Sequence, residues 1–154
     1  MINFYRFIGR FLFIVALPII RIIIKRTQRA YVAIIYNGNL LIVKNWLARN
    51  TWRLPGGGVQ RNESPQECIV REAKEELGIS LDINKVILLH EGVNTTDRLG
   101  FVYAHYYYIC ESEPQLKTNR FEINTHMWTN EQNKDIQFET RRVISELSEK
   151  KMIY

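Results

Sequence analysis

Residues 57–79 of the chain read GGVQRNESPQECIVREAKEELGI, and this stretch says most about the fold. A helix over residues 65–77 is predicted, because Ser64 suits the N-cap position and Glu67, three residues later, completes a capping box. Gly78 suits the left-handed residue that commonly ends a helix. The stretch therefore predicts a glycine-rich loop that leads directly into a well-capped helix.

The predicted helix has two chemically different sides. With successive residues about 100° apart, four apolar side chains share one side and can pack on a sheet: Ile69, Val70, Ala73 and Leu77. Three glutamates share the other side, where we expect them to face away from the core: Glu72, Glu75 and Glu76. Their i, i+3, i+4 spacing brings the three carboxylates together within one turn.

Carboxylates so close repel each other by roughly 0.2–0.5 kcal/mol per pair on an exposed helix. A hard divalent cation such as Mg²⁺ or Mn²⁺ reverses that penalty, because such ions prefer oxygen ligands. An acidic triplet is commonly no more than a solvated helix face, but the surroundings here favour a site. Glycines lie immediately upstream, Glu63 precedes the helix, and Arg71 can pair with Glu75 at i+4.

The Nudix hydrolase family has a signature box that these residues resemble in full: Gly57-x5-Glu63-x7-Arg71-Glu72-Ala73-x-Glu75-Glu76-x-Gly78-Ile79. The preceding residues 52–58, WRLPGGG, are similar to the usual approach to that box. The resemblance implies an α/β (α+β) fold in which a mixed β-sheet is sandwiched between helices. It assigns residues 30–154 to the Nudix domain and leaves residues 1–29 outside it, as an extra hydrophobic and basic helix.

The resemblance also implies an activity, that of a metal-dependent pyrophosphohydrolase. Its substrate would be a nucleoside diphosphate linked to another moiety, and its cofactor Mg²⁺ or Mn²⁺. Family roles carried over to this chain make four residues catalytic: Glu72, Arg71, Glu75 and Glu76. The implied metal ligands are Glu72, Glu75, Glu76 and the carbonyl of Gly56, and the implied supporting residues are Gly57, Glu63 and Gly78.

The residues that recognise the rest of the substrate are less constrained by the motif. Arg53 and Lys44 are candidates for pairing with phosphates. Glu122 is the positional candidate for the additional glutamate that this family often supplies from a later loop. Each of the three also fits an ordinary surface charge, so we keep them as candidate substrate-binding residues.

Outside the box, the sequence predicts several strands and a second helix. Strands are expected over residues 30–36, 40–44, 51–54, 85–91, 101–110 and 126–128, because these runs are rich in apolar, β-branched or aromatic residues. The Asn-Gly-Asn at residues 37–39 predicts a hairpin turn between the first two. Residues 55–58 are expected to form an irregular loop, and residues 139–150 an amphipathic helix.

Composition bounds the class of protein. A chain of 154 residues that is 46% hydrophobic can form one folded domain with a substantial core. Its two cysteines, Cys68 and Cys110, lie far apart and outside any Cys/His cluster. This pattern argues against a disulfide framework or a zinc site and favours a reducing, cytoplasmic compartment.

The net charge of +5 belongs mainly to the N-terminus. Residues 1–29 contain six of the 21 Lys and Arg and no acidic residue, so the other basic residues nearly balance the 16 acidic ones. An extended nucleic-acid groove is therefore disfavoured. The apolar run at residues 11–20, flanked by basic residues, fits an interfacial helix, a single span with snorkelling arginines, or a helix packed on the domain. We favour the first, a peripheral contact of residues 1–26 with the cytoplasmic face of a membrane.

Two other functions stay open. An RNA 5′-end pyrophosphohydrolase would keep the chemistry and change the substrate. A catalytically silent Nudix-like binding or regulatory module would keep only the fold. No glutamate of the box is lost, which argues against the silent module.

Overall fold

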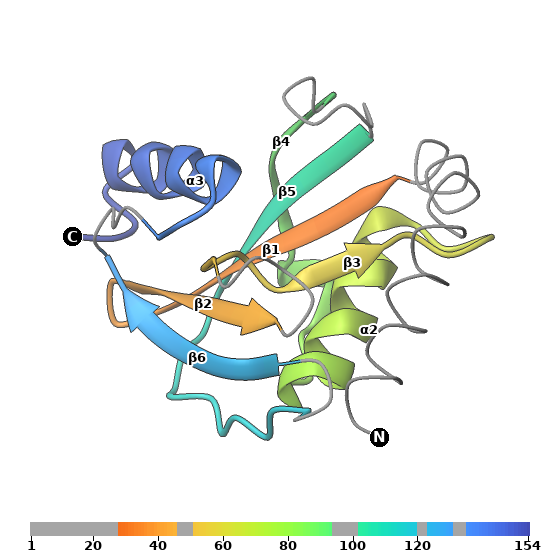
Figure 1. The fold of residues 1–154 in the computed structure, drawn as a ribbon, viewed down its shortest axis with the longest axis horizontal. Helices are drawn as coiled ribbons and strands as arrows, with labels where there is room; N and C mark the ends of the chain where they lie inside the picture. Colours follow the sequence, from red (N-terminus) through yellow and green to blue (C-terminus); the bar gives the residue numbers. More distant parts are fainter. Residues whose placement is uncertain (1–27, 46–50, 94–101, 120–122, 131–134) are drawn as a thin grey trace, which may run out of the picture.

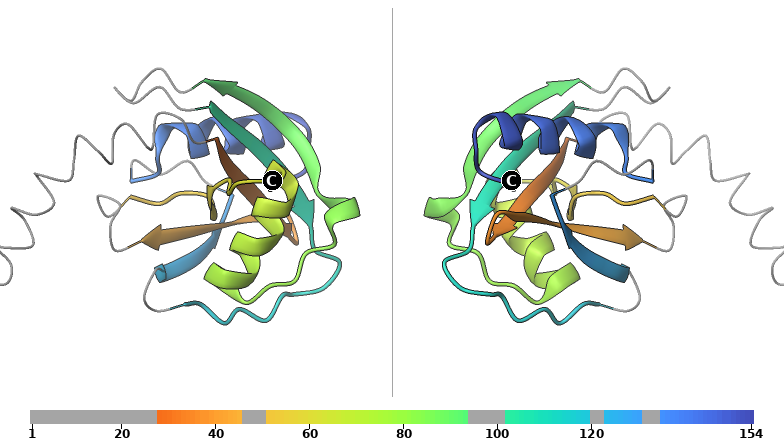
Figure 2. Two further views of the ribbon diagram at one scale, coloured as in Figure 1. Left: turned by 90° about the vertical axis from the view of Figure 1, so that its right-hand side faces the viewer. Right: turned by 90° about the vertical axis from the view of Figure 1, so that its left-hand side faces the viewer.

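The computed structural model describes residues 28–45, 51–93, 102–119, 123–130 and 135–154. They form a mixed, twisted sheet with helices on different sides of it (Figures 1 and 2). The strands are β1 (Arg29–Tyr36), β2 (Asn39–Asn45), β3 (Gly56–Gly58), β4 (Ile87–Val93), β5 (Val102–Ile109) and β6 (Ile123–Thr129). The helices are α2 (Pro65–Leu77), the 3₁₀ helix η1 (Ile83–Lys85) and α3 (Phe138–Glu149). The expected α/β (α+β) fold, a mixed sheet between helices, is confirmed.

β1 is the strand around which the sheet is organised. The strand order is β4-β5-β1-β2-β6, and β3 pairs with β1 as well. β1 runs parallel to β5 and antiparallel to both β2 and β3. The predicted hairpin turn joins β1 to β2, and both Asn37 (φ 47°) and Gly38 (φ 71°) have the positive φ that a type I′ turn requires.

Alternate residues of β1 enter two separate hydrophobic cores, as the period of a strand dictates. One core contains Ala30, Val32 and Ile34, and the buried side of α2 packs into it through Cys68, Ile69, Ala73 and Leu77. The other contains Ala33 and Ile35, and α3 contributes Val143, Ile144 and Leu147 to it. Each helix is therefore fixed to one face of the sheet, and α2 presents its other side to the glycine strand β3.

Four segments differ from the sequence-based prediction, and one of them is strand β6, which starts at Ile123 and not at residue 126. Residues 56–58 form strand β3 and not an irregular loop, because Gly56–Gly58 pair antiparallel with residues 29–31 of β1. Residues 51–54 are not a strand; Trp52 and Arg53 make only single bridges, to Ile136 and Val43. The strand expected to start at residue 85 starts two residues later, because η1 occupies Ile83–Lys85.

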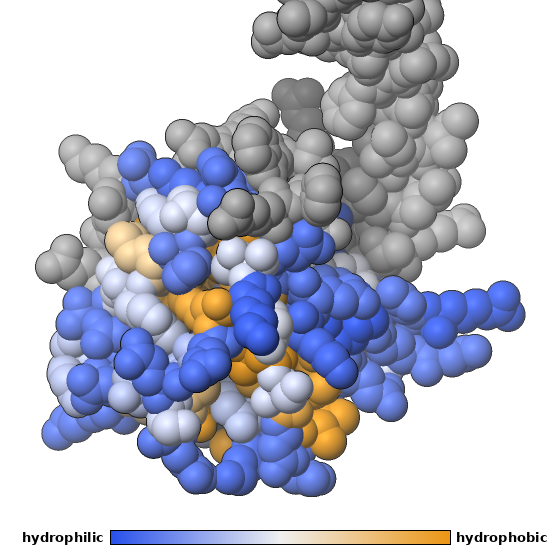
Figure 3. Space-filling model, turned by 90° about the horizontal axis from the view of Figure 1, so that it is seen from below, coloured by the Kyte–Doolittle hydropathy of each residue, from blue (hydrophilic) through white to orange (hydrophobic). Residues whose placement is uncertain are grey.

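The predicted N-terminal helix over residues 1–29 falls almost wholly outside the described residues, and so does Glu122. Within the described ranges, no helix has both the length and the apolar character needed to cross a bilayer. The underside of the molecule, where β6 and the chain leading into it lie, is mostly hydrophilic with small apolar patches (Figure 3).

Candidate active site

Helix α2 carries the acidic cluster, and local interactions determine both of its ends. The Ser64 hydroxyl accepts a hydrogen bond from the Glu67 N–H at 3.2 Å, and the Glu67 carboxylate accepts one from the Ser64 N–H at 2.7 Å. This is the predicted capping box. At the other end Gly78 adopts the left-handed conformation (φ 72°) and its N–H reaches the carbonyls of Ala73 and Lys74. The bounds Pro65–Leu77 agree with the prediction.

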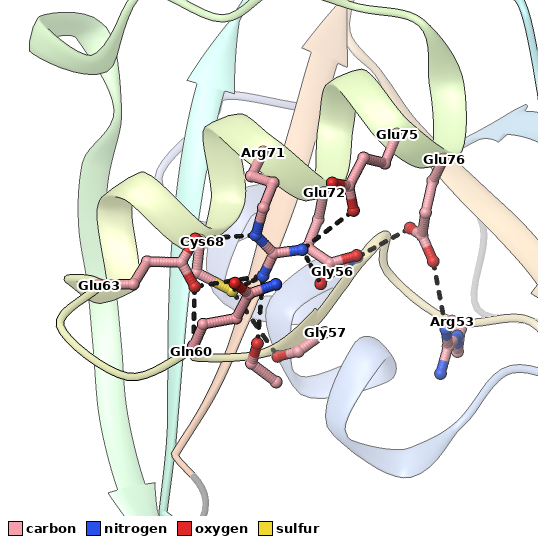
Figure 4. Close-up of polar contacts among 11 residues, drawn as sticks. Arg53, Gly56, Gly57, Gln60, Glu63, Cys68, Arg71, Glu72, Glu75 and Glu76 are labelled. Carbon is pink, nitrogen blue, oxygen red and sulfur yellow. Dashed lines mark hydrogen bonds and ion pairs between the residues drawn. The ribbon is translucent and has the colours of Figure 1, made fainter.

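Strand β3 passes so close to β1 and α2 that two of its glycines have no room for a side chain. A Cβ on Gly56, whose φ is 135°, would lie 2.2 Å from the Ala30 carbonyl oxygen. A Cβ on Gly57 would lie 2.3 Å from Oε1 of Glu72. The glycines therefore let the backbone approach the acidic side of the helix directly, and the strand forms one wall of the candidate site (Figure 4).

Arg71 is the centre of a hydrogen-bond network that holds the carboxylates in place. Its guanidinium donates to Glu63 at 2.8 and 3.2 Å, to Glu72 at 2.8 Å and to Glu75 at 3.0 Å. A further donor reaches the carbonyl of Gly58 at 3.2 Å. The predicted i+4 pair between Arg71 and Glu75 is therefore present, and Glu63 is part of the same network.

These contacts shift the protonation equilibria of the network. The hydrogen bonds that Arg71 donates to Glu63 raise the pKa of Arg71, and its contacts with Glu72 and Glu75 add to that effect. The Arg71 guanidinium in turn lowers the pKa of the Glu63 carboxyl. Glu63 also accepts a hydrogen bond from the Gln60 N–H at 2.8 Å, which fixes the loop between β3 and α2. Glu63 thus stays ionised and ties the loop to the helix.

Glu76 lies in a different environment from the other two glutamates of the cluster. Its residue exposure is 3%, whereas the Glu75 side chain is 55% exposed. Oε2 of Glu76 accepts a hydrogen bond from the Gly56 N–H at 3.1 Å, and Oε1 lies 3.5 Å from the Arg53 guanidinium. Glu76 lies on the glutamate side of α2, as expected, but it is buried there, because β3 and the segment before it, which a helical wheel does not include, cover this position.

The donor set suits a hard divalent cation. Figure 4 shows the carboxylates of Glu72, Glu75 and Glu76 on the side of α2 that faces Gly56 and Gly57. All are oxygen donors, as Mg²⁺ and Mn²⁺ prefer. In the described part of the chain, no group of three acidic, His or Cys side chains already converges on one point. A cation would therefore have to draw the carboxylates partly away from their arginine partners.

The candidate substrate-binding residues are distributed unevenly around this cluster. Arg53 belongs to it through Glu76, and its Nε donates to the Asn45 side chain at 3.2 Å. Lys44 lies with its ammonium 4.7 Å from the centroid of the Trp52 ring, and no ion pair joins it to the glutamates in the described ranges. Asn45 is not among the predicted site residues, because an Asn at the end of a strand carries no signal of a long-range contact.

A second polar cluster lies on the α3 side of the sheet and was not predicted. His90 bonds to Glu146 at 2.8 Å and to His105 at 3.1 Å. His105 is buried and stacks on Tyr31, with ring centroids 5.4 Å apart. Burial, reinforced by His90 and Arg142, lowers the pKa of His105 to about 3. This imidazole is therefore neutral at physiological pH.

The family model for the NUDIX domain matches residues 26–146. The RNA pyrophosphohydrolase of Hydrogenovibrio crunogenus is 29% identical over 89 residues, which cover 52% of this chain and 54% of that protein. The chain therefore matches only about half the length of this relative.

Solved structures share the fold at lower identity. A MutT NUDIX hydrolase from Burkholderia pseudomallei has a TM-score of 0.66 at 22% identity, over 79% of this chain and 97% of that one. A bifunctional NMN adenylyltransferase/ADP ribose pyrophosphatase from Francisella tularensis, solved with AMP and a Mn ion, also has a TM-score of 0.66. Its identity is 19%, and the match covers 80% of this chain and 41% of that one.

Proposed function

The chain belongs to the Nudix family, and on that premise we propose that it is a metal-dependent pyrophosphohydrolase. Its proposed substrate is a nucleoside diphosphate linked to another moiety. The observation that carries the proposal is the position of Glu72, Glu75 and Glu76 beside the glycine strand, where Arg71 and the Gly56 N–H hold them. Such a cluster concentrates the oxygen donors that a hard divalent cation prefers, and the diphosphate group is what a cation there would engage.

The proposed reaction is attack of water on one phosphorus, which breaks the bridging P–O bond and releases two phosphate-bearing products. Bound Mg²⁺ or Mn²⁺ would neutralise the diphosphate oxygens and lower the pKa of the attacking water. Glu72, Glu75, Glu76 and the Gly56 carbonyl are the proposed ligands. Glu72 also accepts the proton that the water loses, which then passes to solvent.

The remaining residues of the site act by placement and charge. Arg71 keeps Glu72 and Glu75 oriented, because its guanidinium bonds to both. Phosphoryl transfer depends chiefly on such positioning and on charge stabilisation. Arg53, which lies beside Glu76, is the residue that we propose to contact a substrate phosphate. Lys44 and Glu122 remain further candidates.

A substrate panel tests this proposal. Release of phosphate or nucleoside monophosphate is measured with nucleotide sugars, dinucleotides, ADP-ribose and nucleoside triphosphates, each with and without Mg²⁺ or Mn²⁺. We expect turnover of at least one nucleoside diphosphate derivative, dependent on the cation. If the wild-type protein binds these nucleotides but leaves every one of them intact, the chain is a Nudix-like binding module and the enzymatic proposal is wrong.

A second candidate is the 5′ end of RNA, which the similarity to an RNA pyrophosphohydrolase favours. The near balance of charges outside the N-terminal segment argues instead for a small substrate, because binding of a nucleic-acid backbone relies on clustered positive charge. A 5′-triphosphorylated oligonucleotide belongs in the panel for this reason. If its kcat/KM exceeds that of every small nucleotide, the 5′ end of RNA is the preferred substrate.

We also propose a division of the chain into a catalytic domain over residues 30–154 and an N-terminal segment that binds the cytoplasmic face of a membrane through residues 1–26. The family match starts at residue 26, which supports the boundary. Deletion of residues 1–26 should abolish sedimentation with anionic vesicles and leave hydrolysis intact. If the truncated domain instead unfolds, the segment is part of the core and the membrane proposal fails.

A further inference from the structure

Arg53 is held beside the proposed metal site through both its backbone and its side chain. Its backbone is fixed by two hydrogen bonds to Val43, at 2.9 and 3.0 Å. Its Nε donates to the Asn45 side chain at 3.2 Å, which directs the guanidinium toward Glu76. The Arg53 side chain is only 17% exposed. The guanidinium is therefore held at the edge of the glutamate cluster.

The two arginines of the site hold their carboxylates with different strength. Arg71 makes contacts of 2.8 Å to Glu63 and Glu72, a length typical of strong charge-assisted hydrogen bonds. Arg53 lies 3.5 Å from Glu76, longer than such bonds usually are. The Gly56 N–H holds the other oxygen of Glu76 independently of Arg53. The Arg53–Glu76 contact is therefore the weaker one and the one that a competing charge can replace.

Resting on the proposed function, we propose that Arg53 is an exchangeable counter-ion that competes with the divalent cation for Glu76 and pairs with a substrate phosphate once displaced. A positive charge beside a ligand oxygen opposes the binding of a second positive charge there. The planar guanidinium also suits a phosphate, and Arg53 uses two of its five N–H donors on described residues. The exchange would link cation binding to substrate binding.

Binding of Mn²⁺ alone tests the first half of the proposal, without any need for turnover. The variants are Arg53→Gln and Arg53→Met, which remove the charge, and Arg53→Lys, which keeps it. Lys85→Gln is the matched control, because it removes a cation from an ion pair with Glu111 that includes none of the glutamates of α2. Free Mn²⁺ is followed by electron paramagnetic resonance, and each variant is checked by thermal melting.

We expect both neutral variants to bind Mn²⁺ about ten-fold more tightly than the wild type. Arg53→Lys and Lys85→Gln should stay within about two-fold, as a remote or retained charge changes little. At saturating Mn²⁺, Arg53→Gln should raise the KM of the best nucleotide substrate about ten-fold and change kcat less, because the lost contact is made in the ground state as well. Arg53→Lys should recover part of that loss.

The outcomes separate this inference from the proposed function. Unchanged or weaker Mn²⁺ binding in both folded neutral variants would overturn the counter-ion role of Arg53 while leaving the metal site intact. Tighter Mn²⁺ binding with an unchanged KM would overturn the transfer to phosphate. A wild-type protein that binds no Mn²⁺ at all would refute both the competition and the metal-dependent function on which it rests.

Discussion

Replacement of Gly57 by alanine perturbs the site at a single point, because the one added carbon contacts one carboxylate, that of Glu72. In a Gly57→Ala variant the new Cβ would lie 2.3 Å from Oε1 and 2.6 Å from Cδ of Glu72. Carbon and oxygen atoms in contact usually stay more than about 3.4 Å apart, so the carboxylate has to move by about 1 Å. The backbone itself tolerates alanine, since a left-handed φ is found at Gly38, Gly56 and Gly78 and not at Gly57.

Displacement of the Glu72 carboxylate should reduce the activity of the protein much more than its stability. Moving Glu72 breaks its 2.8 Å contact with Arg71, which costs about 1.5–3 kcal/mol for a hydrogen bond between charged groups. The change from Gly to Ala offsets about 0.4–1 kcal/mol of this through the unfolded state. Misplacing a catalytic group by about 1 Å can reduce the rate by about 100-fold. We therefore expect a folded protein with kcat reduced about 100-fold.

Gly58→Ala is the matched control, because no atom lies within 4 Å of a Cβ at that position. Initial rates at saturating Mg²⁺ and substrate give kcat, and urea denaturation gives the free energy of unfolding for both variants. Gly58→Ala should keep kcat within about two-fold of the wild type. Equal kcat values for the two alanine variants would refute the placement of Glu72 beside β3.

Three further predictions follow from the helix cap, the buried glutamate and the buried histidine. Ser64→Ala should lower the free energy of unfolding by about 1 kcal/mol in urea denaturation and leave kcat unchanged, because it removes only the capping hydrogen bond; a large loss of kcat would contradict that local role. Glu76→Gln should lose turnover and also about 1–3 kcal/mol of stability by the same measurement, because Glu76 is buried and bonded to Gly56 and Arg53. Unchanged stability would show that the carboxylate is not held as described. Burial lowers the pKa of His105 from near 6.5 in the unfolded state to about 3 in the folded state. As the pH drops, the unfolded state therefore takes up the proton first. The free energy of unfolding falls between about pH 6.5 and pH 3, by at most about 1.4 kcal/mol per pH unit. Urea denaturation at pH 7 and pH 5 should show this fall in the wild type and a smaller one in His105→Gln, and an equal fall in both would assign the effect to other groups.

Local sequence signals were enough to predict α2. Its start and end depend on Ser64, Glu67 and Gly78, and each of these acts within a few residues of its own position. The same holds for the turn between β1 and β2, where Asn37 and Gly38 supply the positive φ values. These elements could be predicted because the interactions that determine them are short-range.

Contacts between distant segments account for what the sequence did not show. Three consecutive glycines have no strand propensity, and Gly56–Gly58 form a strand only because β1 provides partners for them. Glu76 is buried by Gly56 and Arg53, which lie about 20 residues earlier in the chain. The pairing of His90 with Glu146 spans 56 residues. Helical periodicity and motif spacing contain no information about such contacts.

The proposed function requires that the glutamates of α2 bind the divalent cation on which hydrolysis depends. Glu75→Gln tests it most directly, because the Glu75 side chain is 55% exposed and its loss should change the free energy of unfolding by no more than about 0.5 kcal/mol. Mn²⁺ affinity and the rate of nucleotide hydrolysis are measured on the same samples, with Glu149→Gln, on the exposed end of α3, as the control. We predict that Glu75→Gln loses both by about 100-fold while Glu149→Gln keeps both. Wild-type affinity and turnover in a folded Glu75→Gln protein would contradict the proposed function.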